Sequence, residues 1–212
     1  MKLDHIILAC PDLEAGCEEV KRRLGIELVT GGRHENMGTH NALAGLNQGA
    51  YLELLAPDAK GVSTGLAQKL RTLGGVTLYH WAVSHPQSAP LSRVDGILPE
   101  SWVPGRRRLS DGSELTWHLM FPQSDLGALV PFFIDWGDTP SPGKQLEASG
   151  RLAAIRLRTP RANVLAAWLK PLPQVQIEEA AQGSWSIELI SGAERWSLSS
   201  VSDHLEGIQS WH

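Results

Sequence analysis

The segment LDHIILACPDLEAGCEEVKRRLG, residues 3–25, decides the fold of this chain. Residues 3–10 are mostly apolar and predict a buried strand, which ends at Pro11. Asp12 is a good N-cap, and apolar side chains then recur at helical spacing. Gly25 stands where helices commonly end. The segment therefore predicts a strand–Pro–helix unit.

The same unit recurs along the 212 residues. The first unit continues with three predicted strands, which gives the order βαβββ: residues 26–30, 39–46 and 50–56. A helix is predicted over 65–73. The second unit repeats the order with a strand, a weaker helix, a hairpin and a last strand: residues 76–84, 89–94, 102–109 with 114–121, and 130–136. The pattern predicts an α+β fold of tandem βαβββ modules.

The chain divides at a stretch rich in Pro and Gly, residues 137–150, which does not suit regular structure. Residues 1–140 are predicted to form the paired modules. Residues 150–212 are predicted to add a shorter C-terminal βαβββ-like unit that packs on them. There Thr159 and Pro160 are predicted to cap a helix.

The charge and composition of the chain restrict its possible partners and its location in the cell. The net charge of −4 and the pI of about 6.1 argue against nucleic acid as the main partner, because phosphate binding needs a concentrated basic surface. The run Arg106-Arg107-Arg108 predicts a hairpin edge; the alternative is an anion-binding patch at the mouth of a cleft. The N-terminus lacks a signal-peptide pattern, and no apolar stretch suits a membrane span. We therefore expect a cytoplasmic protein that binds neither nucleic acid nor membrane.

Two histidines stand at matching places in the first two units. His5 lies six residues before Pro11, and His80 lies six residues before Pro86. Since side chains of a strand alternate between its faces, the equal offset predicts equivalent positions on equivalent strands. The third unit has Ala154 at this place. Imidazole is the commonest metal-binding side chain near neutral pH, so the pair suggests a metal site in the first two units.

A carboxylate is expected to complete this set. Glu53 lies among apolar neighbours in YLELL, residues 51–55, and a buried carboxylate needs a partner such as a metal. Two His and one carboxylate can hold a metal and leave positions open for substrate or O₂. Glu188 is the rival carboxylate, and Asp135 is a weaker one. His5, Glu53 and His80 could each instead have a purely structural role.

Other side chains are candidates for the cleft wall. Thr39 and Asn41 are predicted to point into the cleft from their strand. Tryptophan is abundant, with eight residues in the chain, and it lines pockets for flat ligands as well as cores. The tryptophans expected at the cleft are Trp81, Trp102, Trp117 and Trp136.

Taken together, these motifs resemble the glyoxalase-like domain family of the vicinal oxygen chelate superfamily, which includes glyoxalases, bleomycin-resistance proteins and extradiol dioxygenases. The similarity covers about residues 1–140, and the pieces that carry it are residues 3–13, 31–34, 38–43, 51–55, 80–82, 111–112 and 131–137. The resemblance implies that the modules curl into an open sheet around a cleft. It also implies a divalent metal ion in that cleft, with Fe, Mn, Zn and Ni as the candidates.

Carried over by position, the resemblance implies that His5, Glu53 and His80 are the metal ligands. The sequence departs from the family pattern at Phe133, where the resemblance implies a second carboxylate. The leading hypothesis is a metal-dependent lyase, isomerase or dioxygenase that acts on a small organic substrate, with the metal as Lewis acid or O₂ activator. The sequence identifies no catalytic base. The alternative is a protein of the same fold that only sequesters a small molecule. A homodimer is compatible with both.

Overall fold

The computed structural model describes residues 1–108, 114–169 and 172–201. Its strands are β1 Lys2–Ala9, β2 Val29–His34, β3 Thr39–Leu46, β4 Tyr51–Pro57, β5 Thr77–Ser84, β6 Ile97–Leu98, β7 Val103–Arg108, β8 Glu114–Met120, β9 Gln123–Ser124, β10 Phe132–Asp135, β11 Ala148–Thr159, β12 Val175–Glu179, β13 Ser184–Ser191 and β14 Glu194–Val201. Its α-helices are α1 Leu13–Leu24, α2 Gly65–Arg71 and α3 Ala162–Trp168. Short 3₁₀ helices occur at Glu35–Met37, Asn47–Gly49, Gly127–Leu129 and Pro142–Lys144. The predicted turn at residues 110–113 lies outside the described residues.

The first strand–Pro–helix unit forms as predicted. The Asp12 side chain accepts a hydrogen bond from the Ala15 amide at 2.9 Å and so caps α1. Gly25 ends the helix in the left-handed conformation, with φ of 64°, and its N–H donates to the Lys21 carbonyl.

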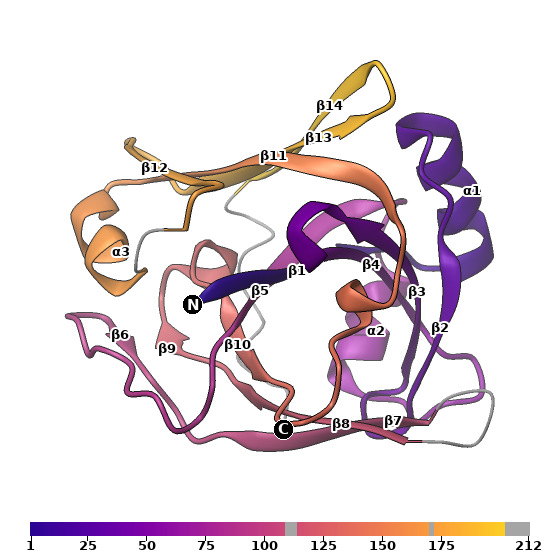
Figure 1. Ribbon diagram of the computed structural model, residues 1–212, viewed down its shortest axis with the longest axis horizontal. Coiled ribbons are helices and arrows are strands. Elements are labelled where there is room, and N and C mark those ends of the chain that lie inside the picture. Colours follow the sequence, from indigo (N-terminus) through magenta and orange to yellow (C-terminus); the bar gives the residue numbers. More distant parts are fainter. Residues whose placement is uncertain (109–113, 170–171, 202–212) are drawn as a thin grey trace.

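Apart from β6 and β9, which pair with each other, the described strands form one large curled sheet with the order β14-β13-β11-β3-β2-β7-β8-β10-β5-β1-β4, and β12 pairs with β11. Because β4 also pairs with β3, the eight strands of the two modules close on themselves (Figure 1). The fold is thus α+β with few helices and a large curled sheet, as predicted. Strand β11 joins the C-terminal segment to this sheet through Gly45 and Leu46 of β3. The division into residues 1–140 and 150–212 stays a prediction.

The strand pairing makes His5 and His80 equivalent. In the first module, Glu53 of β4 pairs in parallel with Ile7, two residues after His5. In the second module, Phe132 of β10 pairs in parallel with Ala82, two residues after His80. Phe132, and not Phe133 as the sequence suggested, therefore stands at the counterpart of Glu53.

Three local predictions were wrong. Helix α3 begins at Ala162 with Arg161 as its N-cap and without a side-chain capping bond, so Thr159 and Pro160 do not cap it. The expected helix at 89–94 does not form; Pro90 removes a backbone donor there, and Val94 makes an isolated bridge with Ile97 instead. The first module's second strand runs over residues 29–34 rather than 26–30, and Gly31 and Gly32 lie inside it.

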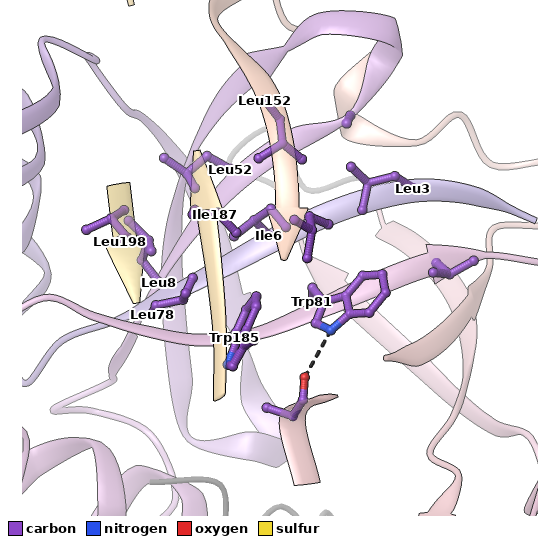
Figure 2. Packing of buried hydrophobic residues seen from close by; sticks show 14 of the residues in the cluster. Leu3, Ile6, Leu8, Leu52, Leu78, Trp81, Leu152, Trp185, Ile187 and Leu198 are labelled. Carbon is purple, nitrogen blue, oxygen red and sulfur yellow. Dashed lines mark hydrogen bonds between the residues drawn. The ribbon is translucent and has the colours of Figure 1, made fainter. Parts of the chain in front are cut away.

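The main core lies on the side of β1, β4 and β5 that faces the C-terminal segment. Figure 2 shows Ile6 and Leu8 of β1 with Trp81 of β5 packed against Trp185 and Ile187 of β13. Trp81 is fully buried, and its indole N–H donates to the Ala128 carbonyl at 3.0 Å. A second, smaller cluster on the opposite side contains Ile7, Ala82 and Phe132. Alternation along the strands thus separates a packing face from a cavity face.

No helix in the described part of the chain is long and apolar enough to cross a membrane.

Truncating Trp81 tests the packing role of this face. We expect Trp81→Ala to lower the free energy of unfolding by about 3–5 kcal/mol, because it leaves a cavity in the core and removes the bond to Ala128. Val29→Ala is the control, since Val29 is 53% exposed on β2 and its truncation should cost little. Urea unfolding followed by tryptophan fluorescence and circular dichroism measures both. Equal effects of the two substitutions would contradict the assignment of Trp81 to the core.

Candidate active site

A cavity opens on the inner side of the curled sheet. Its walls are largely aromatic and aliphatic, with Trp117, Leu119, Phe121, Phe132, Ile134 and Trp136 among them. Polar side chains also line it: His5, His34, Asn41, Tyr51, Glu53 and Arg107. An apolar cavity with a few convergent polar groups is the usual form of a small-molecule site.

The polar part of the wall centres on His5. Its Nδ1 lies 2.7 Å from Asp4 Oδ1, and its Nε2 lies 3.5 Å from Glu53 Oε2. All three side chains are buried. Since the Asp4 carboxylate accepts the hydrogen of Nδ1, Nε2 is the nitrogen that faces Glu53 and the cavity. Tyr51 stacks on the imidazole at 4.7 Å between ring centroids.

An irregularity in β1 makes the Asp4–His5 contact available. Consecutive side chains of a regular strand point to opposite faces. The pairing of β1 with β5 shifts register between Leu3 and His5, however, and such a bulge re-aims a side chain. The Trp136 indole N–H then donates to Asp4 Oδ2 at 3.0 Å and holds the other carboxylate oxygen.

Asn41 of β3 connects the acidic and basic sides of the cavity. Its amide Nδ2 donates to Glu53 Oε1 at 2.6 Å. Its Oδ1 accepts from the Gly32 amide at 2.8 Å and from Arg107 Nη1 at 3.2 Å. These partners fix the orientation of the amide group. A continuous chain of contacts therefore runs from Asp4 through His5, Glu53 and Asn41 to Arg107.

His34 lies at the end of β2, and its Nδ1 is 3.1 Å from Thr39 Oγ1. Burial lowers the pKa of His34 from its ordinary value to about 4, although the nearby Glu53 carboxylate acts in the opposite direction. His34 is therefore a neutral imidazole at neutral pH. Thr39 is fully buried and holds His34; it lies behind the wall instead of in it.

His80 lies outside the wall that the described residues form. It is buried, and its ring meets the Phe132 ring edge-on at 5.3 Å between centroids, while Phe132 also contacts His5 at 5.5 Å. The Trp81 amide donates to His80 Nδ1 at 2.8 Å. Nδ1 also lies 3.1 Å from the Trp81 carbonyl oxygen, so the backbone of Trp81 can hold either tautomer. Burial lowers the pKa of His80 to about 4, so the imidazole is neutral.

These contacts bear on the divalent metal that the sequence suggests. His5 and Glu53 have the geometry of two ligands, with Asp4 orienting the imidazole as carboxylates do in metal sites. His80 is not among the residues that line the cavity, and its Nδ1 lies against the Trp81 backbone, so Nε2 is the nitrogen left to face an ion. Among the described residues, no three His, Cys, Asp or Glu side chains are grouped to hold an ion. The three-ligand set stays a prediction.

The tryptophans expected at the cleft divide into two groups. Trp117 and Trp136 line the cavity, with their rings 5.4 Å apart between centroids. Trp81 lies in the core on the opposite face of β5, and Trp102 packs at the edge of that core. The rival carboxylate Glu188 is engaged by Arg156 and Arg195 in the C-terminal segment. Asp135 binds the amides of Gln87 and Gly137.

Sequence reasoning did not find Asp4, Tyr51 and Phe132 as parts of the site. Asp4 precedes His5 directly, and only the bulge brings it to the same side. Tyr51 is detectable from its spacing, since it stands two residues before Glu53 on β4. For the run Arg106-Arg107-Arg108, an anion-binding patch was only the alternative to a hairpin edge. Alternation of side chains along β7 is the signal that could have placed Arg107 on the inner face.

Comparisons with known proteins identify the family of the chain. Residues 3–172 match the model of the glyoxalase-like domain, and the chain therefore belongs to that family. Among solved structures, a hypothetical protein from Staphylococcus aureus has a TM-score of 0.54 at 18% identity, over 93% of this chain and 84% of that one. Methylmalonyl-CoA epimerase from Mycobacterium tuberculosis has a TM-score of 0.43 at 22% identity, over 64% of this chain and 88% of that one. No curated protein matches the chain significantly.

The role of His80 in metal binding can be tested by ion content. We expect His80→Ala to leave the divalent-ion content of the protein unchanged after incubation with Fe, Mn, Zn or Ni, since His80 is not among the residues that line the cavity. Mass spectrometry of the dialysed protein measures the ion content, and His5→Ala is measured in parallel. One equivalent of ion in the wild type that His80→Ala abolishes would establish the three-ligand set.

Burial of His34 should be visible in the pH dependence of stability. The pKa is lower in the folded chain, about 4, than the ordinary 6.5 of an unfolded one, so the unfolded state takes up the proton first. Stability from this group is therefore complete above pH 6.5 and falls as the pH drops toward 4, by on the order of 3 kcal/mol.

The slope is measured by urea unfolding between pH 4 and pH 7. We expect His34→Gln to reduce it and the exposed His118→Gln to leave it unchanged. An unchanged slope in His34→Gln would show that folding does not lower the pKa of His34.

Proposed function

We propose that this chain is an enzyme that moves a proton on a small organic molecule bound in the cavity, with Glu53 and His5 as the groups that carry the proton. The observation that carries the proposal is the buried chain Asp4–His5–Glu53 at the wall of an apolar cavity. Linked, oriented acid–base groups facing a pocket are the usual basis of proton-transfer catalysis.

Glu53 is positioned to accept the proton. Asn41 donates to Oε1 at 2.6 Å and thereby holds the carboxylate in one orientation. Oε2 is left beside His5 and the cavity. A base that is fixed before the substrate binds loses little freedom in the transition state, which is how positioning contributes to rate.

His5 is positioned to exchange the proton with Glu53. Its Nε2 faces Glu53, and Asp4 fixes the tautomer and stabilises the imidazolium that forms when Nε2 takes a proton. The separation of 3.5 Å between Nε2 and Oε2 is long for a hydrogen bond, and such contacts commonly tighten when a substrate binds. The pair can therefore remove a proton and return it to the same or a neighbouring atom.

The metal-dependent form of this function, predicted from the sequence, needs a third ligand. Because no three described His, Cys, Asp or Glu side chains are grouped to hold an ion and Phe132 stands at the counterpart of Glu53, the proposal includes no step through a metal ion. The proposal relies on the side chains in place.

Sequestration of a ligand without turnover is the competing function. The Trp117 and Trp136 rings, 5.4 Å apart, favour it, because paired indoles form a good surface for a flat apolar molecule. Proton exchange distinguishes the two functions.

Deuterium exchange provides the test. We expect the wild type to accelerate exchange of the hydrogens next to the carbonyl in at least one member of a panel of small ketones and keto acids, followed by NMR in D₂O. Glu53→Gln should reduce this rate by a factor of about 10² or more. Glu188→Gln is the matched control, because Glu188 is as buried as Glu53, at 7% exposure each, but lies outside the cavity.

Binding of panel members without faster exchange would favour sequestration. An exchange rate that Glu53→Gln does not change would exclude Glu53 as the base. Circular dichroism of each variant verifies that it is folded.

A further inference from the structure

Arg107 is a buried cation in the wall of an apolar cavity. Only 6% of the residue is exposed, although its neighbour Arg106 on β7 is exposed and lies 3.8 Å from Glu114 on the surface. Alternation along the strand sends these two arginines to opposite faces. Arginine is rarely fully buried unless it is paired, so the inward one requires an explanation.

The contacts of Arg107 leave its charge without a counter-ion. Nη1 donates to the neutral Asn41 amide oxygen at 3.2 Å. Nε is buried and has no hydrogen-bond partner. Within the described residues, no carboxylate forms an ion pair with this guanidinium, and Glu53 is reached only through Asn41. A buried guanidinium without an anion is unfavourable unless a ligand supplies one.

Two glycines make space for this side chain. A Cβ at Gly32 would lie 2.6 Å from Arg107 Cδ and 3.0 Å from its Nε. A Cβ at Gly31 would lie 2.1 Å from Asn41 Oδ1 and 3.1 Å from Arg107 Nη1. Strand β2 therefore tolerates no side chain at either position while Asn41 and Arg107 keep their places.

We propose that Arg107 binds the carboxylate of the substrate, so that the cavity takes a small organic acid with an apolar body. The proposal rests on the proposed function of the same cavity. Guanidinium groups bind carboxylates through paired N–H donors, and they do so most strongly where water is excluded. The cavity wall already holds the Glu53 carboxylate, and the Asp4 carboxylate lies directly behind His5, so a singly charged ligand suits the cavity better than a phosphate dianion.

The arrangement also orients the ligand. Asn41 contacts both Arg107 and Glu53, so the anion site and the proton acceptor lie on either side of one amide group. An acid held at Arg107 presents the carbon next to its carboxylate toward Glu53. Its apolar body is left to lie against Trp117 and Phe132, which line the same cavity.

Matched acids and amides test the proposal. The probes are phenylacetate, 3-phenylpropionate and hexanoate, each paired with its primary amide, and the dissociation constants are measured by isothermal titration calorimetry on the full chain. We expect the wild type to bind at least one acid 10-fold or more tightly than its amide. Arg107→Met should abolish this preference, and Arg107→Lys should keep part of it.

Arg106→Met is the control, since it removes the same charge from the opposite face of β7 and should keep the preference. Absence of any acid preference in the wild type, or a preference that survives in folded Arg107→Met, overturns the proposal. Glu53→Gln separates this proposal from the catalytic one, because it should abolish proton exchange and retain the acid preference. An acid preference that depends on Arg107, without proton exchange in the wild type, would leave the anion site standing and refute the catalytic function.

Discussion

The hydrogen bond between Asp4 and His5 decides what the rest of the cavity can do. It places a hydrogen on Nδ1 and leaves Nε2 directed at Glu53, 3.5 Å away. The bond exists because β1 is irregular at this point, so that two consecutive side chains can meet. The Trp136 indole, from the second module, donates to the other carboxylate oxygen of Asp4. This bond connects the irregular part of β1 to the second module.

The buried polar and charged side chains of the cavity wall also hold one another in place. Glu53 is oriented by Asn41, Asn41 is oriented by Gly32 and Arg107, and Arg107 lies where the glycines of β2 leave room. A half-satisfied polar network is costly in an apolar interior, and the Nε of Arg107 is a buried atom of this network without a hydrogen-bond partner. The network is therefore complete apart from an acceptor at the guanidinium.

Much of the fold could be predicted because its signals are local. The Asp12 cap, the Gly25 end of α1 and the βαβββ order follow from spacing and turn residues. Part of the site was predictable for the same reason, since equal offsets from Pro11 and Pro86 place His5 and His80 at equivalent positions. What the sequence could not supply was the side to which residues near an irregularity point. Asp4 joins His5 only through a bulge, and a one-residue difference in register exchanges Phe133 for Phe132 at the cavity.

The two modules are equivalent in backbone and unequal in chemistry. Where the first module has Glu53, the second has Phe132, whose ring contacts both imidazoles. Its apolar bulk lies beside His80 and leaves that imidazole neutral and bonded to the backbone. The acid–base groups therefore belong to the first module, while Trp117, Phe121 and Phe132 of the second supply an apolar wall. Among the described residues of the second module that line the cavity, only Arg107 carries a charge, and it reaches the first module through Asn41. The cavity therefore has a polar wall from the first module and a largely apolar wall from the second. Such a cavity suits a small molecule with one charged end and an apolar body.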